Sequence, residues 1–171
     1  MSTTELEMYL VRHGIAEDAS PDGSDYARAL TAEGSANMRD EAAGLGRLKV
    51  RLDVILTSPL VRARQTAEVL AAHIGGKPSI VISPALATSG SPAAVMTQLR
   101  KEKFQGRIAL VGHEPGMGEL AAMCLGMSTP APFKKGGVCR IDFDLPLRDA
   151  TGLLRWFATP KMLIATGRAA S

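Results

Sequence analysis

The sequence predicts an α/β fold in which a mostly parallel central sheet lies between two layers of helices. Four short apolar runs of strand length occur at residues 6–11, 53–58, 79–82 and 107–113. Apolar residues recur at helical spacing between them, and strands that alternate with helices favour a parallel sheet covered on both faces. With 171 residues, of which 46% are hydrophobic, the chain can bury the core of one such domain.

The first helix is predicted to begin after Leu30, with Thr31 as its N-cap, because threonine often caps helices. Gly34 lies inside this helix, where a glycine weakens the helical pattern. The residues expected to face the core follow near i, i+3, i+4 and i+7 spacing: Met38, Ala42, Leu45 and Leu48.

Ser58 and Pro59 predict the start of the second helix, since serine caps helices and proline is favoured at the first helical position. The two glycines at 75–76 are expected to end it. Its core-facing residues are expected to be Leu60, Ala63, Ala67 and Leu70.

The rest of the chain predicts two more helices and two more strands. We expect helices over about 92–102 and from Pro115 to Gly126. Strands are expected within 136–145 and 152–160, separated by a turn-rich segment.

The domain organisation is simple, because the sequence has no internal repeat, low-complexity tract or linker. We expect residues 1–171 to form one domain with short flexible ends at 1–5 and 166–171. The N-terminal segment has no basic region before its apolar run, and no apolar stretch approaches ~18 residues, so neither export nor membrane spanning is indicated. The cytoplasm is the expected location.

The charge is distributed unevenly along the chain. Residues 1–60 hold 10 acidic and 6 basic side chains, whereas residues 61–171 hold 7 acidic and 14 basic ones. This asymmetry favours an anionic ligand. Aromatic residues make up only 4% of the sequence and the basic residues do not cluster, so a nucleic-acid partner is not expected. Cys124 and Cys139 lie in apolar surroundings and are expected to be buried free thiols.

Two histidines and two arginines are expected at the carboxyl ends of three predicted strands. The residues at these ends are Arg12, His13 and Gly14 after the first strand, Ser58 and Arg62 after the second, and His113 and Glu114 after the fourth. Because the carboxyl ends of parallel strands share one edge, these side chains are expected to converge on one crevice.

Such a crevice suits a phosphoryl group. Guanidinium groups match phosphate oxygens, and two predicted helices begin at the same edge with their positive dipole ends. Nearby positive charge lowers the pKa of an imidazole, so His13 is expected to be neutral and nucleophilic. Gly14 would let the backbone approach a ligand or adopt a positive φ. The third histidine, His73, is expected to be a surface residue near a helix end.

Competing chemistries find less support. The chain lacks the nucleotide, dinucleotide, zinc-protease and serine-hydrolase motifs. A metal site through His113, Glu114 and Glu119 is not expected, because the predicted arginines would repel a metal ion.

Three segments resemble the signatures of the histidine phosphatase superfamily, whose members include cofactor-dependent phosphoglycerate mutases and acid phosphatases. The segments are LVRHG at 10–14, TSPLVRARQTAEVL at 57–70 and LVGHEPGM at 110–117. The resemblance extends over about residues 6–160 and implies a phosphoglycerate mutase-like, three-layer α/β/α domain. The RHG-x-A pattern is most similar to the phosphohistidine phosphatase branch of SixA type.

The resemblance also implies roles for individual residues. His13 would be the nucleophile that becomes phosphorylated, Arg12 and Arg62 would hold the phosphoryl oxygens, and His113 would donate a hydrogen bond to the same group. Gly14 and a backbone amide near Glu114 would assist phosphate binding. Ser58 would cap its helix beside the pocket, and neither a metal nor an organic cofactor is implied.

One departure from the superfamily bears on the substrate. Many members place a Glu or Asp after the third strand as proton donor, but residues 83–92 contain no carboxylate. Loss of a general acid costs about 10²–10⁴ in rate for an alkoxide leaving group, whereas the imidazole of phosphohistidine needs less help. We therefore expect a metal-independent phosphohistidine phosphatase, with His113, Glu17, Asp18 or Glu114 as remaining candidates for proton donor.

The partner would be a phosphohistidine-bearing protein domain or a small phosphorylated molecule, and neither nucleic acid nor a membrane is expected. The sequence does not fix the oligomeric state, although a monomer is favoured. Two alternatives stay open: a phosphomonoesterase or mutase acting on a small metabolite, and a silent phosphate-binding module.

Overall fold

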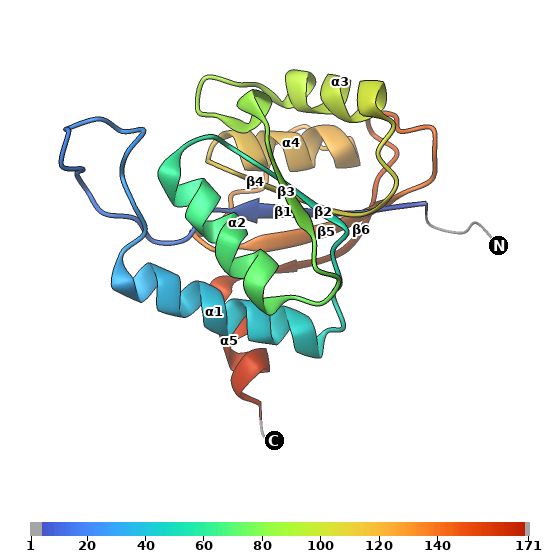
Figure 1. The fold of residues 1–171 in the computed structure, drawn as a ribbon. Coiled ribbons are helices and arrows are strands. Elements are labelled where there is room, and N and C mark those ends of the chain that lie inside the picture. The colour runs from blue at the N-terminus through green and yellow to red at the C-terminus, as the bar shows by residue number, and fades with distance from the viewer. Residues whose placement is uncertain (1–4, 170–171) are drawn as a thin grey trace.

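The computed structural model describes residues 5–169, which form a six-stranded sheet with helices on both faces (Figure 1). The strand order is β3-β2-β4-β1-β5-β6. The first four of these strands are parallel, and the last two pair antiparallel. The strands are β1 (Leu6–Arg12), β2 (Val54–Thr57), β3 (Ser79–Ile82), β4 (Gly106–Gly112), β5 (Val138–Phe143) and β6 (Leu153–Ala158). The predicted α/β class with a mostly parallel sheet is confirmed.

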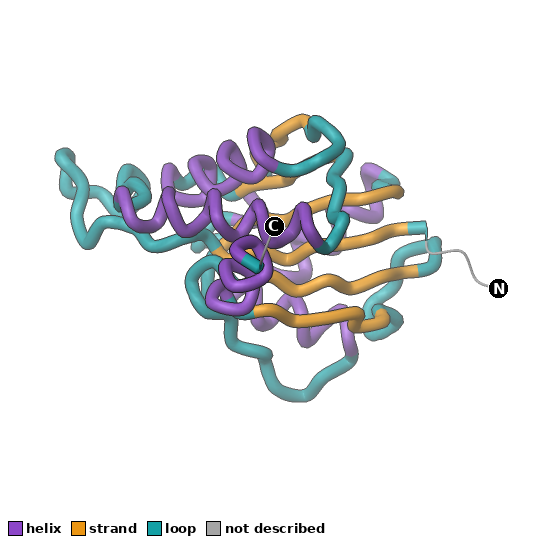
Figure 2. Tube along the Cα trace, turned by 90° about the horizontal axis from the view of Figure 1, so that it is seen from below, coloured by secondary structure: helices purple, strands orange, loops and turns teal. Residues whose placement is uncertain are grey.

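The described residues form five α-helices. They cover the sheet in two layers, as the view in Figure 2 also shows. The helices α1 (Ala32–Arg47), α2 (Val61–His73) and α5 (Pro160–Arg168) lie on one face, and α3 (Pro92–Glu102) and α4 (Gly116–Leu125) lie on the other. A short 3₁₀ helix, η1 (Pro84–Leu86), follows β3. No helix within residues 5–169 is both long and apolar enough to cross a membrane.

Strand β1 is buried on both sides because its side chains alternate between two hydrophobic clusters. Leu6, Met8 and Leu10 pack with residues of α3 and α4. Tyr9 and Val11 pack with residues of α1, α2 and α5. A central parallel strand with helices on both faces reads as a continuous apolar run for this reason.

The start of α1 agrees with the sequence prediction, but its last predicted core residue does not. Thr31 caps the helix, and its hydroxyl accepts a hydrogen bond from the Gly34 amide at 2.8 Å. Leu48, which was expected to face the core, is the C-cap residue and is 47% exposed. That part of the prediction is wrong because the helix ends one residue earlier.

Helix α2 begins later than expected. Its N-cap is Leu60, and no side chain caps it. Ser58, predicted as the cap, instead accepts a hydrogen bond from the Leu60 amide at 3.2 Å and contacts His113. The serine therefore belongs to the turn before the helix.

The C-terminal helix α5 was not predicted. Thr159 caps it by accepting a hydrogen bond from the Met162 amide at 3.3 Å, and Pro160 occupies its first turn. The sequence prediction placed Thr159 and Pro160 in the strand expected within 152–160, so it missed this helix start. Of the predicted flexible ends, 1–4 and 170–171 lie outside the described residues, whereas 166–168 continue α5.

Helix α5 packs closely against α1 at Gly44. A Cβ atom at this position would overlap the backbone carbonyl group of Leu163. The nearby Gly46 lies in the same helix, and a Cβ atom there would meet nothing within 4 Å. Comparing the same substitution at the two glycines therefore separates the effect of helix–helix packing from the effect of helix propensity.

We predict that Gly44→Ala lowers the free energy of unfolding by about 1–3 kcal/mol, because α5 must shift to admit the methyl group. Gly46→Ala is the matched control and should raise it by roughly 0.5–1 kcal/mol, since alanine favours the helix. Denaturant unfolding of both variants measures the difference. Equal stabilities of the two variants would contradict the close packing.

Glu41 of α1 is an uncommon buried acid. Glu41 is 1% exposed, and its Oε2 atom has no hydrogen-bond partner among the described residues. Burial raises the pKa of its carboxyl group to about 9. It lies beside Gly136, whose amide donates to the carbonyl groups of Arg12 and His13 at 3.1 and 3.0 Å. Glu41 is therefore protonated in the folded protein at neutral pH but ionised in the unfolded chain.

Because the folded pKa of Glu41 is raised, the unfolded state gains stability as pH rises above about 4.5. We predict that the free energy of unfolding of Glu41→Gln exceeds that of the wild type by more at pH 8 than at pH 5. Glu33→Gln, at an exposed position of the same helix, serves as control and should keep the wild-type pH dependence. An identical pH dependence for Glu41→Gln would contradict this assignment.

Candidate active site

The structure brings the four predicted side chains of the strand ends together. Arg12 is the last residue of β1 and His13 follows it, Arg62 lies in the first turn of α2, and His113 follows β4. The strands β1, β4 and β2 are neighbours in the sheet, so their carboxyl ends meet at one edge. We call Arg12, His13, Arg62 and His113 the His–Arg cluster.

The ring of His13 is held in one tautomer. It is 5% exposed, and its Nδ1 atom lies 2.7 Å from the Gly14 carbonyl oxygen. A carbonyl can only accept, so Nδ1 carries the hydrogen and donates. The Nε2 atom therefore keeps its lone pair, and it accepts a hydrogen bond from Arg62 Nε at 3.3 Å.

The ring of His113 lies beside that of His13, with 5.0 Å between the ring centroids. Its Nε2 atom is 2.8 Å from Ser58 Oγ, which accepts from the Leu60 amide. A hydroxyl has one hydrogen to donate and two lone pairs that accept, so either Ser58 Oγ or His113 Nε2 can be the donor of this bond. Nδ1 is buried and has no partner within residues 5–169.

Both rings are neutral at physiological pH. Burial, followed by the positive charge of Arg62 and Arg12, lowers the pKa of His113 to about 4, while Asp25 acts in the opposite direction. The pKa of His13 falls to about 3, chiefly through burial and also through His113 and the two arginines, against the effect of the Gly14 carbonyl group. A neutral imidazole in positive surroundings can act as a nucleophile.

Arg12 is anchored by the loop before β5. Its Nη1 atom donates to the Phe133 carbonyl oxygen at 2.7 Å. Its Nε atom is buried and has no hydrogen-bond partner in the part of the chain that the structure describes. The guanidinium thus retains donor capacity toward the cluster.

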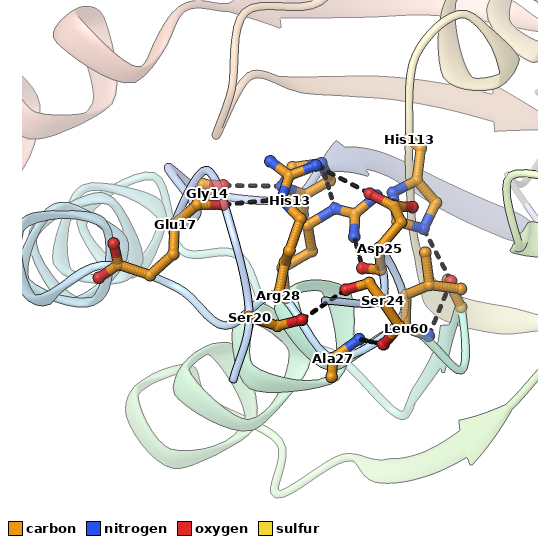
Figure 3. A network of polar contacts seen from close by, with 12 residues as sticks. His13, Gly14, Glu17, Ser20, Ser24, Asp25, Ala27, Arg28, Leu60 and His113 are labelled. Carbon is orange, nitrogen blue, oxygen red and sulfur yellow. Dashed lines mark hydrogen bonds and ion pairs between the residues drawn. The ribbon is translucent and has the colours of Figure 1, made fainter. Parts of the chain in front are cut away.

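Arg62 makes a contact that the sequence did not predict. Its Nη1 atom donates to the Asp25 carbonyl oxygen at 2.8 Å, and its Nη2 atom lies 3.1 Å from Asp25 Oδ2. The other carboxylate oxygen of Asp25 pairs with Arg28 Nη1 at 2.8 Å (Figure 3). Asp25 lies in the loop between β1 and α1, where three aspartates occur, and no local pattern distinguishes it from Asp18 or Asp22.

The other predicted residues have different surroundings. The Gly14 amide donates to Thr66 Oγ1 at 3.1 Å, and a Cβ atom at Gly14 would lie 2.9 Å from Met38 Cγ. Close packing explains this glycine, and its φ is not positive. The Oε1 atom of Glu114 accepts from the Gly118 amide at 2.8 Å. Phosphate binding by Gly14 or Glu114 stays a prediction.

The candidate proton donors differ in position. Glu17 and Asp18 are exposed, and the structure pairs neither of them with the His–Arg cluster. A small cleft of about 90 Å³ opens beside His113, and its acidic lining residues are Glu114 and Glu119. Within residues 5–169, no group of three or more His, Cys, Asp or Glu side chains could hold a metal ion. Cys124 and Cys139 are buried and free, as expected.

Comparisons with known proteins agree on one family. The family model described as histidine phosphatase superfamily (branch 1) matches residues 8–88. An uncharacterized protein of Picosynechococcus sp. is 40% identical over 119 residues, which are 68% of this chain and 71% of the relative. Phosphohistidine phosphatase SixA of Escherichia coli is 28% identical over 158 residues, covering 91% of this chain and 94% of SixA.

The fold comparison gives the same result. The solved structure of the protein histidine phosphatase SixA complexed with tungstate matches with a TM-score of 0.82 and 26% identity, covering 91% of this chain and 97% of that chain. The solved α-ribazole phosphatase of Shigella flexneri shares the fold, with a TM-score of 0.69 and 18% identity, covering 90% of this chain and 96% of that chain.

The lowered pKa values of His13 and His113 predict that both rings stay neutral from pH 8 down to about pH 5. Nitrogen and proton NMR shifts of the rings measure this, with His73 as an internal exposed control. As pH falls below about 6.5, the unfolded state takes up protons that the folded state does not, so these two histidines lower the free energy of unfolding. A midpoint near 6.5 for either buried ring would contradict the assignment.

Proposed function

The chain belongs to the histidine phosphatase superfamily and is a phosphatase, and we propose that it is a metal-independent phosphohistidine phosphatase that acts through phosphorylated His13. The observation that carries the proposal is the environment of His13 Nε2. The Gly14 carbonyl group binds the other ring nitrogen, so a lone pair remains on Nε2 inside a cluster of two guanidiniums. SixA, to which the chain is similar, has been solved with tungstate, an oxyanion like phosphate.

In the proposed first step, His13 Nε2 attacks the phosphorus atom in line with the leaving group. Arg12 and Arg62 stabilise the phosphoryl oxygens, because their donors are fixed before the charge develops. His113, whose ring lies 5.0 Å from that of His13 between centroids, donates a hydrogen bond to the same group. Water then hydrolyses the phospho-His13 intermediate.

The substrate proposal depends on the leaving group. Most of residues 83–92 line the cleft beside His113, and this stretch supplies no carboxylate as proton donor. An alkoxide would leave slowly without one, whereas an imidazole protonated on its second nitrogen leaves as a neutral molecule. The proposal therefore favours phosphohistidine over sugar phosphates.

We further propose that the phosphoryl group is presented by another protein. The His–Arg cluster lies at the carboxyl end of the parallel strands. The connections that follow β2 and β4 there are short, at residues 58–60 and 113–115, whereas the connection from β1 to α1 spans residues 13–31 and contacts Arg62 through Asp25. An open site can admit a side chain from a protein surface. The same proposal includes a location in the cytoplasm and a reaction without a cofactor.

Phosphate labelling tests this function. We predict that ³²P-phosphohistidine transfers its label to the tryptic peptide 13–28 after an alkaline quench, and that EDTA leaves turnover unchanged. His13→Ala should abolish label and turnover, because it removes the nucleophile. His73→Ala, at an exposed helix end, should label like the wild type.

Three outcomes would contradict the proposal. Full turnover by His13→Ala would exclude the covalent intermediate. Turnover of glycerate or sugar phosphates well above that of phosphohistidine would favour a phosphomonoesterase or mutase. Phosphate binding without label or turnover of any substrate would indicate a silent binding module.

A further inference from the structure

We propose that Asp25 makes the active site selective for phosphoryl groups whose leaving group is a cation, such as a phosphohistidine ring protonated on its second nitrogen. This inference rests on the proposed function, because it names the substrate's charge state at the same site. It assigns a specificity role to a residue that the sequence prediction missed.

The position of Asp25 carries the inference. Its carboxylate bridges Arg62, which is 4% exposed, and Arg28, which lies toward solvent. The side chain of Asp25 is itself 54% exposed, whereas that of Arg62 is 5% exposed, so the carboxylate lies on the solvent side of Arg62. Figure 3 shows it among the side chains of His13, Arg28 and His113. It is also close enough to His113 to raise the pKa of that ring.

The backbone holds this carboxylate in place. The Arg62 guanidinium donates to the Asp25 carbonyl oxygen, and the Val61 amide donates to the next carbonyl oxygen, that of Tyr26, at 3.0 Å. Arg28 Nε donates to the Glu17 carbonyl oxygen at 2.7 Å, which closes the loop. Three hydrogen bonds thus hold Asp25, Tyr26 and Arg28 in place.

In-line attack places the leaving group near Asp25. His13 is 5% exposed and forms the floor of the site. The leaving group lies on the side of phosphorus opposite His13 Nε2. Because His13 is buried and the side chain of Asp25 is 54% exposed, the proposed role puts Asp25 on that side. A negative group there attracts a cationic leaving group and repels a second anion.

The charged and titratable groups facing Asp25 come from three elements: the charged Arg62 of α2, the charged Arg28 of its own loop, and the neutral ring of His113 after β4. Burial raises the pKa of Asp25, but the hydrogen bonds and charges of Arg28 and Arg62 together outweigh it and lower the pKa, so the carboxylate is ionised near neutral pH. It therefore acts by its charge and does not serve as proton donor in the first step.

The transfer step balances without an external acid. His13 Nε2 forms its bond to phosphorus as the bond to the substrate ring nitrogen breaks, and the bonding pair stays on that nitrogen. The ring is already protonated on its other nitrogen, so it leaves as neutral imidazole. Water then attacks phosphorus, the electron pair returns to His13 Nε2, and dihydrogen phosphate leaves. Asp25 favours the protonated form of the substrate ring until the bond breaks.

The test compares two substrates in one isosteric variant. Asp25→Asn keeps an oxygen for Arg62 but removes the charge. We expect kcat/KM for phosphohistidine to fall about tenfold or more and kcat/KM for p-nitrophenyl phosphate, whose leaving group carries no positive charge, to rise about threefold. The inhibition constant of orthovanadate should fall, because the anion no longer meets a second negative charge.

Two further variants complete the design. Arg28→Met removes a cation that competes for the carboxylate, so the ratio of the two kcat/KM values should move opposite to that of Asp25→Asn. Asp149→Asn disrupts an exposed ion pair with Arg100, 3.0 Å long, outside the site and should leave the ratio unchanged.

The outcomes separate this inference from the proposed function. If the wild type hydrolyses phosphohistidine but Asp25→Asn lowers both kcat/KM values equally, Asp25 only positions Arg62 and the inference is wrong. Unchanged values for both substrates would also overturn it. If the wild type itself neither hydrolyses phosphohistidine nor labels peptide 13–28, the proposed function fails instead.

Discussion

The hydrogen bond from His13 Nδ1 to the Gly14 carbonyl oxygen determines what the rest of the site can do. At 2.7 Å it commits the hydrogen of the ring to one nitrogen and leaves the lone pair on the other. Burial and neighbouring cations keep the ring neutral. Without this bond, the surrounding donors would face a ring of undefined tautomer, and the lone pair would not be held toward them.

The same carbonyl belongs to a residue whose amide is also fixed, by Thr66 of α2. The backbone after β1 is therefore tied to the helix that carries Arg62. Met38 of α1 packs against Gly14, so the nucleophile, the guanidinium and the first helical layer form one packed unit. The packing of α1 and α2 in the core consequently fixes the geometry of the site, and a shift of either helix would move the reacting groups.

The balance of charge is the second feature of the site. Two guanidiniums and two helix N-termini meet two neutral imidazoles, and Asp25 is the acid in direct contact with Arg62. The negative charge of this carboxylate lowers the positive electrostatic potential at the opening of the site, and the carboxylate does not occupy the floor of the site. Glu41, in contrast, is buried without a charged partner and stays protonated, so it adds no charge beside the cluster.

The sequence by itself determined the sheet class, most element boundaries and the four members of the His–Arg cluster, because these depend on local periodicity and on residues that directly follow strands. The tertiary structure alone decided that Ser58 contacts His113 and that Asp25, among three similar aspartates, binds Arg62. These contacts join positions 55 and 37 residues apart, so they depend on where loops return to the sheet. Helix α5 shows the reverse case: its cap signal was local, but its docking depends on the space that Gly44 leaves on α1.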